Sequence, residues 1–171
     1  TQRPLRGGAW SNAIALGGGK DPNVTVQKGK VFVSWSDSRN AYRLATRTFK
    51  KDKWQSVVYV SNLTGSFRSH AVLDSKGKPH LIWMQNIDGR NYDIYYADLI
   101  KRKWTAPKAI RRTYGFDEGN DLVIDSKDIL HAVYLEMTSH KSAFSSDRSG
   151  AVTAADDLAL AVPTQTSLPA T

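Results

Sequence analysis

Short runs of alternating apolar and polar residues, separated by turn-forming residues, recur along this chain. In its middle, the runs 71–73 and 80–84 flank a polar turn, the run 94–97 follows a polar loop, and the run 104–110 follows a second turn. Such alternation between turn signals predicts β-strands. The pattern indicates four antiparallel strands within about fifty residues. No stretch carries a sustained helical period, so we expect few helices.

Aromatic residues mark the same places in successive repeats. Trp10, Trp54 and Trp104 each open a strand, with separations of 44 and 50 residues. A second series of strands ends in an aromatic residue, with steps of 48 and 51, at Trp35, Trp83 and Tyr134. Two independent series with nearly one period show that the chain contains a structural repeat.

Four strands in 40 to 50 residues are typical of a β-propeller blade. We therefore predict an all-β fold, a partial β-propeller of about three four-stranded antiparallel blades plus a lone N-terminal outer strand. The expected boundaries are an outer strand and linker over 1–22, blades over 23–68, 69–118 and 119–161 (the last one ragged), and a flexible tail over 162–171. Since propellers close with about four to eight blades, further blades or subunits are expected as partners, a homodimer among them.

The run 72–107 carries a DSKG turn, a strand ending in Trp83, a DIYYA strand and a KWTAP start of the outer strand. In these pieces it resembles a blade of the sialidase-like propellers with BNR or Asp-box repeats. The resemblance is at blade level and covers roughly 10–153. The turn 98–104 keeps the tryptophan of the Asp box but lacks its serine and glycine. The resemblance implies an enzyme, a lectin or a scaffold, because such propellers host all three. We expect a secreted protein, extracellular or periplasmic.

Composition narrows the choice of chemistry. The absence of cysteine excludes disulfides, thiolate metal sites and cysteine nucleophiles, and no apolar run is long enough to span a membrane. A net charge of +8 favours anionic partners. Half of the 24 basic residues fall in turns predicted on one face, which is either a surface for an anionic polymer or a set of solvated turns. Nucleic acid is not expected as a partner.

The opposite face holds the candidate ligand residues. Asp37 and Arg39 repeat the pattern D-x-R-N of Asp88 and Arg90 in the next blade. The donor fork of an arginine suits a carboxylate or sulfate. The alternative is an aspartate–arginine pair that stiffens each loop.

A second group of candidates lies at the starts of the inner strands. Arg68 and His70 stand there, with Asn23 and Asp121 in places equivalent to His70. These polar side chains are expected to line the mouth of a central channel, where they hold a ligand, an ion or water.

Two further candidates complete the set of ligand residues. Tyr92 offers an aromatic face for a sugar ring, and Glu136 with the arginines gives an incomplete match to a sialidase site. Our first hypothesis is a non-catalytic propeller module that binds a glycan or a protein. The alternatives are a fragment of a sialidase-like glycoside hydrolase and an electrostatic binder of anionic polymer. No catalytic residue, cofactor or metal site is assigned.

Overall fold

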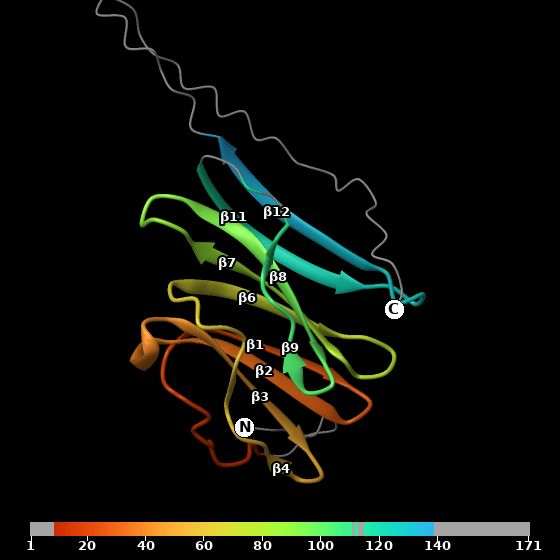
Figure 1. The fold of residues 1–171 in the computed structure, drawn as a ribbon. Helices are drawn as coiled ribbons and strands as arrows, with labels where there is room; N and C mark the ends of the chain where they lie inside the picture. Colours follow the sequence, from red (N-terminus) through yellow and green to blue (C-terminus); the bar gives the residue numbers. More distant parts are fainter. Residues whose placement is uncertain (1–8, 111, 113–114, 139–171) are drawn as a thin grey trace, which may run out of the picture.

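The computed structural model describes residues 9–110, 112 and 115–138. Over these residues the chain is all-β except for the short 3-10 turn η1 (Ser38–Asn40), and antiparallel strands form three successive units (Figure 1). None of the sheets in the described chain closes on itself. Nor do the described residues include a helix that could cross a lipid bilayer.

Each of the first two units contains three long strands and an outer edge made of two short ones. Unit 1 contains β1 (Lys20–Gln27), β2 (Lys30–Asp37), β3 (Arg43–Lys50), β4 (Lys53–Trp54) and β5 (Val58–Tyr59). Unit 2 contains β6 (Ser66–Leu73), β7 (Pro79–Asn86), β8 (Tyr92–Ile100), β9 (Lys103–Trp104) and β10 (Lys108–Ala109). Of unit 3, β11 (Gly115–Ile124) and β12 (Leu130–Thr138) are described.

The alternating pattern located these strands, but their starts differ from the expected boundaries. The inner strands β1, β6 and β11 begin three or four residues before positions 23, 69 and 119. An interruption of the ladder near the start of each one hides this first segment from a search for strict alternation. The part of the predicted third blade beyond residue 138 and the predicted tail 162–171 lie outside the described residues.

The predicted outer strands take a different form from the one expected. The stretch 104–110 forms two short strands, and Pro107, which has no N–H to donate, lies in the gap between them. The stretch 10–16, predicted as a lone outer strand, forms no strand. In units 1 and 2 the outer edge pairs with the third strand of the same unit, β3 or β8. No such strand precedes Trp10 in the described chain, which explains the difference.

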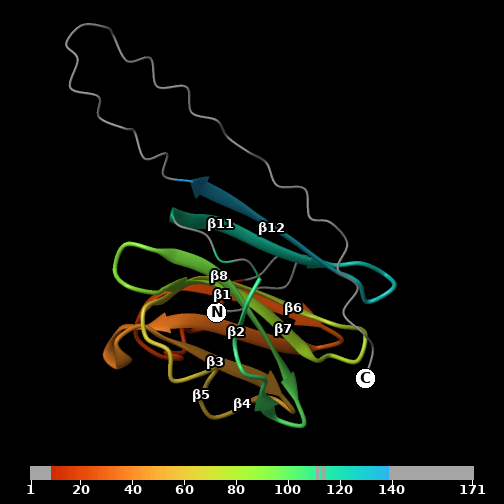
Figure 2. The ribbon, with the colours of Figure 1, turned by 45° about the horizontal axis from the view of Figure 1, so that its top comes forward.

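The units pack face to face through side chains, and unit 2 lies between the other two (Figures 1 and 2). In β7, Leu81 and Trp83 belong to the core shared with unit 1, whereas Ile82 and Met84 belong to the core shared with unit 3. This is why nearly every residue of β7 is buried. The half-buried Trp104 meets Phe32 of unit 1 edge-on, with ring centroids 6.2 Å apart. Among the described residues, one backbone bridge joins units 2 and 3, from Phe116 to Tyr92.

Candidate binding site at the inner-strand bulges

The same β-bulge interrupts all three inner strands. One extra residue enters each strand just before Asn23, His70 and Asp121, which are the first residues to resume pairing with the neighbouring strand. The structure therefore gives these three residues the equivalent places that the sequence predicted. A bulge re-aims nearby side chains and bends the strand, so its recurrence turns three sets of polar groups in a common direction.

Each bulge contains a residue with left-handed backbone dihedrals. The φ angles are +53° at Asp21, +47° at Arg68 and +63° at Gly119. Glycine adopts this conformation freely, whereas for a residue with a side chain it costs about 1 kcal/mol or more of conformational free energy. Arg68 thus occupies a position where the third unit uses glycine, and the cost points to a role for its side chain.

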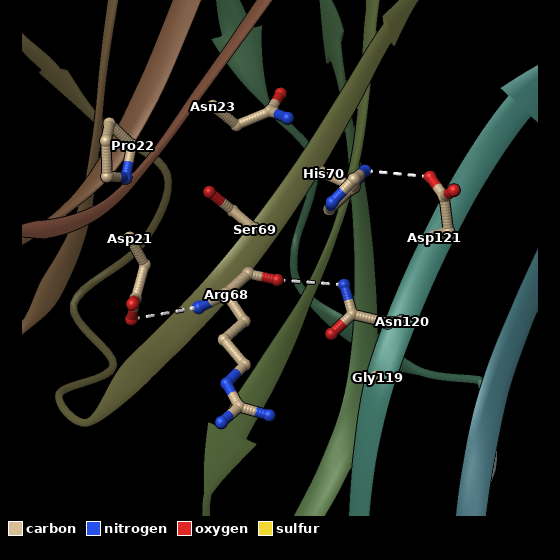
Figure 3. Close-up of a pocket in the computed structure, with 9 residues that line it drawn as sticks. All are labelled: Asp21, Pro22, Asn23, Arg68, Ser69, His70, Gly119, Asn120 and Asp121. Atoms are coloured by element: carbon tan, nitrogen blue, oxygen red, sulfur yellow. Dashed lines mark hydrogen bonds and ion pairs between the residues drawn. The ribbon is translucent and has the colours of Figure 1, made fainter.

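The bulges surround an open hollow of about 450 Å³ (Figure 3). Its lining comes from β1, β6 and β11 and consists of Asp21, Pro22, Asn23, Arg68, Ser69, His70, Gly119, Asn120 and Asp121. With the exception of Pro22 and Gly119, every lining side chain carries a hydrogen-bonding or charged group. The hollow is therefore suited to a polar ligand rather than to an apolar one.

Hydrogen bonds across the strands hold these groups in place. Between β1 and β6, the Asp21 carboxylate accepts from the Arg68 backbone N–H at 3.3 Å, and the Asn23 amide oxygen accepts from the Ala71 N–H at 3.1 Å. Between β6 and β11, the Asn120 side chain donates to the Arg68 carbonyl at 2.8 Å. These bonds replace a continuous backbone ladder between the inner strands.

A histidine–carboxylate pair completes the links between β6 and β11. His70 Nδ1 lies 2.8 Å from Asp121 Oδ1, and both side chains are partly exposed toward the hollow (Figure 3). The same carboxylate oxygen accepts from the Leu122 backbone N–H at 2.7 Å. The pair presents a donor and an acceptor side by side in a fixed geometry.

Of the residues predicted from sequence to hold a ligand or to line the channel mouth, Arg68, His70, Asn23 and Asp121 line this hollow. The lining residues that the sequence did not single out are Asp21, Pro22, Ser69, Gly119 and Asn120. They flank the predicted positions in equivalent places of the three bulges, so the repeat register was the signal that could have found them. The other predicted residues, described next, lie in loops and on outer parts of the strands.

Asp37 is a buried loop anchor. It is the last residue of β2, and its carboxylate accepts from the Tyr59 hydroxyl at 2.7 Å, the Asn40 amide at 2.9 Å and the Arg39 backbone N–H at 3.1 Å. The exposed Arg39 side chain adds a contact at 3.3 Å. Burial opposes ionisation of Asp37, but these hydrogen bonds outweigh it and lower its pKa to about 2. This arrangement matches the loop-stiffening alternative.

The second D-x-R-N sequence occupies a different place in its unit. Counting from the bulges, Asp37 corresponds to the buried Gln85 of unit 2, whereas Asp88 lies three residues farther along, in an exposed loop. The Asp88 side chain accepts from the backbone N–H groups of Arg90 at 2.9 Å and Asn91 at 2.7 Å. These two bonds lower its pKa. The motif thus recurs in the sequence without recurring at an equivalent position.

Tyr92 and Glu136 also lie apart from the hollow. Tyr92 opens β8, its half-buried ring packs 6.3 Å from that of Phe67, and its hydroxyl accepts from the Asn86 side chain at 3.2 Å. Glu136 is half-buried on β12, opposite Asp117 of β11. The structure therefore does not gather these two side chains with Arg68 into one site.

Several lysines of the predicted basic face form bonds within the protein. Lys28 donates to the Ser75 carbonyl at 2.9 Å and Lys30 donates to the Gly77 carbonyl, so both link unit 1 to a turn of unit 2. Lys78 pairs with Asp98 inside unit 2. These contacts give the turn lysines a structural role, and the Asp98 carboxylate neutralises the charge of Lys78.

No metal-binding cluster is found within the described residues: no three His, Asp or Glu side chains lie close enough to hold an ion. His80 and His131, which share a repeat position, each lie near an aspartate of their own turn, at 3.5 Å from Asp74 and 3.4 Å from Asp125. Burial lowers the pKa of His80, whose other ring nitrogen lies 2.8 Å from the Tyr96 hydroxyl.

Comparisons with known proteins identify no family. No protein-family model matches the chain, and no curated protein matches it. Among solved structures, the chain is similar to a fucose lectin from Kordia zhangzhouensis in complex with methyl-fucoside, at 14% sequence identity and a TM-score of 0.48. The match covers 69% of this chain and 85% of the lectin. This likeness is too distant to assign a fold family or a ligand.

Proposed function

We propose that this chain is a non-catalytic binding module made of consecutive β-propeller blades, and that it binds a saccharide in the hollow between the inner strands. One observation carries the proposal. The same bulge occurs in three neighbouring strands and directs carboxylate, imidazole, amide and guanidinium side chains toward one open hollow. The three bulges lie at equivalent positions of β1, β6 and β11. Because bulges are enriched next to functional sites, this recurrence favours a binding function for the hollow.

The arrangement of the units supports the propeller. Each complete unit contains antiparallel strands in chain order from the inside outward, and the inner strands of successive units are neighbours. This is the order of strands in a propeller blade. We further propose that the repeats are of the sialidase-like type. We also propose that the protein acts outside the cell or in the periplasm.

The chemistry of the hollow supports a saccharide. Sugar hydroxyls both donate and accept, and the hollow offers acceptors at Asp21 and Asp121 beside donors at Arg68 and Asn120. The proline ring of Pro22 supplies an apolar surface for the C–H groups of a pyranose. Because the cross-strand hydrogen bonds already order several of these side chains, binding loses less conformational entropy.

The positions of the arginines favour binding over hydrolysis. A sialidase-like site requires several arginines and an acid around one ligand, but only Arg68 lines the hollow. Arg39 lies beside the buried Asp37, and Glu136 is on β12. The hydrolase alternative would therefore need groups that the hollow does not combine.

A glycan array followed by calorimetric titration of the selected saccharide tests this function. We expect His70→Ala to weaken binding about tenfold, since leaving a polar group of the hollow without its hydrogen-bond partner costs about 1–3 kcal/mol. Arg90→Ala, in an exposed loop outside the hollow, is the matched control and leaves affinity unchanged. Absence of saccharide binding, or an equal loss in both variants, contradicts the proposal.

A fluorogenic sialoside assay separates the two functions. We expect no turnover by the wild-type chain. Turnover that Arg39→Ala abolishes would replace the binding module with the hydrolase.

A further inference from the structure

The inner half of unit 1 has an uncovered apolar face. Val24 and Val26 of β1, with Val31 and Val33 of β2, lie on the side turned away from unit 2. Val24 is 63% exposed, and Val26 is exposed to a similar degree. Alternation along a strand places these side chains on one surface, which we call the open face of unit 1.

The same positions are buried wherever a neighbouring unit is present. Val24 follows Asn23, the first paired residue after the bulge, and its equivalents are Ala71 in unit 2 and Leu122 in unit 3. Ala71 is 7% exposed and Leu122 is 5% exposed, because the preceding unit covers each of them. The open face of unit 1 is therefore one half of an interface that the chain forms twice internally.

Unit 3 presents the complementary half. Val123 of β11 and Val133 of β12 lie on the side turned away from unit 2 and are exposed. Val133 is 43% exposed, whereas its equivalent in unit 2, Ile82, is fully buried against unit 3. We call this surface the open face of unit 3.

We propose that the open face of unit 3 docks on the open face of unit 1 of a second copy of this chain. A second copy is the expected partner because the interface would continue one that the chain already contains. The residues of the two open faces are equivalent to those that pack between units 1 and 2 and between units 2 and 3. The proposal rests on the repeat architecture of the proposed function and not on the saccharide. Two copies bring the number of units into the range that closes a propeller.

Polar groups of the inner strands also fit the docking of unit 3 on unit 1 of a second copy. Asn23 of unit 1 accepts from the backbone N–H of Ala71 in the following unit. Asp121 occupies the place of Asn23 in unit 3, and Val24 occupies the place of Ala71 in unit 1. In the docked pair, the Asp121 carboxylate accepts from the Val24 N–H of the second copy.

The segment before β1 leaves room for this docking. Ser11, Ile14 and Leu16 lie along the open face of unit 1 and form a groove of about 520 Å³ with its valines, Phe49 and Trp54. Arg47 ties the segment down by donating to the Leu16 carbonyl at 3.1 Å. The segment leaves Val24 and Val26 exposed, so the inner half of the face stays accessible.

Light scattering of the full chain across a concentration series tests the docking. The wild-type mass should approach twice the 19.0 kDa of one chain. Val24→Arg and Val133→Arg should each weaken association at least about a hundredfold, because each places a charge in an apolar interface. Both residues are exposed in the single chain, so folding should tolerate the changes. Ile100→Arg, at an exposed apolar position outside both faces, is the control and should associate like the wild type.

Mixing the two variants tests the head-to-tail arrangement. A mixture of Val24→Arg and Val133→Arg should regain partial association, since the pair retains one interface with both faces intact. A wild-type chain that stays monomeric overturns the proposal, and so does association that Val24→Arg breaks while Val133→Arg leaves it intact. Saccharide binding by a monomeric variant would show that the function of the hollow stands independently of the docking.

Discussion

Replacing Asp37 with asparagine tests whether this residue anchors a loop or waits for a ligand. The side chain is fully buried at the end of β2 and accepts hydrogen bonds from Tyr59, Asn40 and Arg39. Asparagine keeps the shape but loses the charge that strengthens these bonds. If the anchor interpretation is correct, the substitution lowers the free energy of unfolding.

The magnitude follows from the pKa of Asp37. A fall from an ordinary 3.8 to about 2 corresponds to about 2.5 kcal/mol, at about 1.4 kcal/mol for each pH unit. Solvent around the exposed loop screens part of this, so we expect a loss of about 1.5 kcal/mol at pH 7. Because the folded-state pKa is the lower one, the contribution is fully present above about pH 4 and disappears as the pH falls toward about 2.

Urea unfolding followed by tryptophan fluorescence at pH 7 and pH 3 measures this difference. Asp88→Asn is the control, because Asp88 belongs to the same sequence motif but lies in an exposed loop, so its substitution should lower the stability clearly less. Equal stability of the two variants at pH 7 would refute the anchor. So would a deficit in Asp37→Asn that does not shrink at pH 3.

Three further outcomes test other parts of the account. Arg68→Gly should keep or raise the free energy of unfolding, by up to about 1 kcal/mol, because glycine adopts the left-handed backbone conformation of this position without strain. The same substitution should weaken saccharide binding in calorimetry. A lower free energy of unfolding would contradict this. Leu81→Ala should cost about 3 kcal/mol in urea unfolding, because Leu81 is fully buried between units 1 and 2; a loss below about 1 kcal/mol would argue against a shared core. A sulfated polysaccharide should bind weakly in a titration at low salt, because Lys28, Lys30 and Lys78 form bonds within the protein. Tight binding whose affinity falls steeply with salt concentration would instead support the hypothesis of an electrostatic binder of anionic polymer.

The sequence was sufficient to predict the strands and the repeat. Alternation and regularly spaced aromatic residues located β6 to β8, and the structure places two of these aromatic residues, Trp83 and Trp104, in the packing between units. These features depend on local pattern and on burial, which a single sequence records directly.

The binding site was predicted only in part. Arg68 and His70 were found because they stand out chemically, and Asn23 and Asp121 because they occupy the place of His70 in the other repeats. The rest of the hollow depends on a bulge whose residues share no side-chain type between units. Conversely, the recurrence of D-x-R-N in successive loops indicated one role for Asp37 and Asp88, whereas the structure places them in different registers. The ladder between β7 and β8 continues for one more residue pair, Asn86 with Tyr92, than the ladder between β2 and β3, which ends at Asp37. The motif therefore starts at the end of the strand in unit 1 but inside the loop in unit 2.

The contacts between units were the least predictable. Lys28 and Lys30 looked like solvated turn residues, yet they reach carbonyls about 47 residues away in the next unit. A lysine in a turn has the same sequence context whether it faces water or a neighbouring turn. Only the packing of the units decides between these two surroundings.

Amide chemical shifts during titration with the saccharide selected on the array test the central claim most directly, because they locate the bound ligand. The account predicts that the largest changes fall on the three bulges, at residues such as Asn23, His70 and Asp121, which line the hollow. Changes centred on the loops that follow β2 and β7, with the bulge amides unmoved, would contradict it.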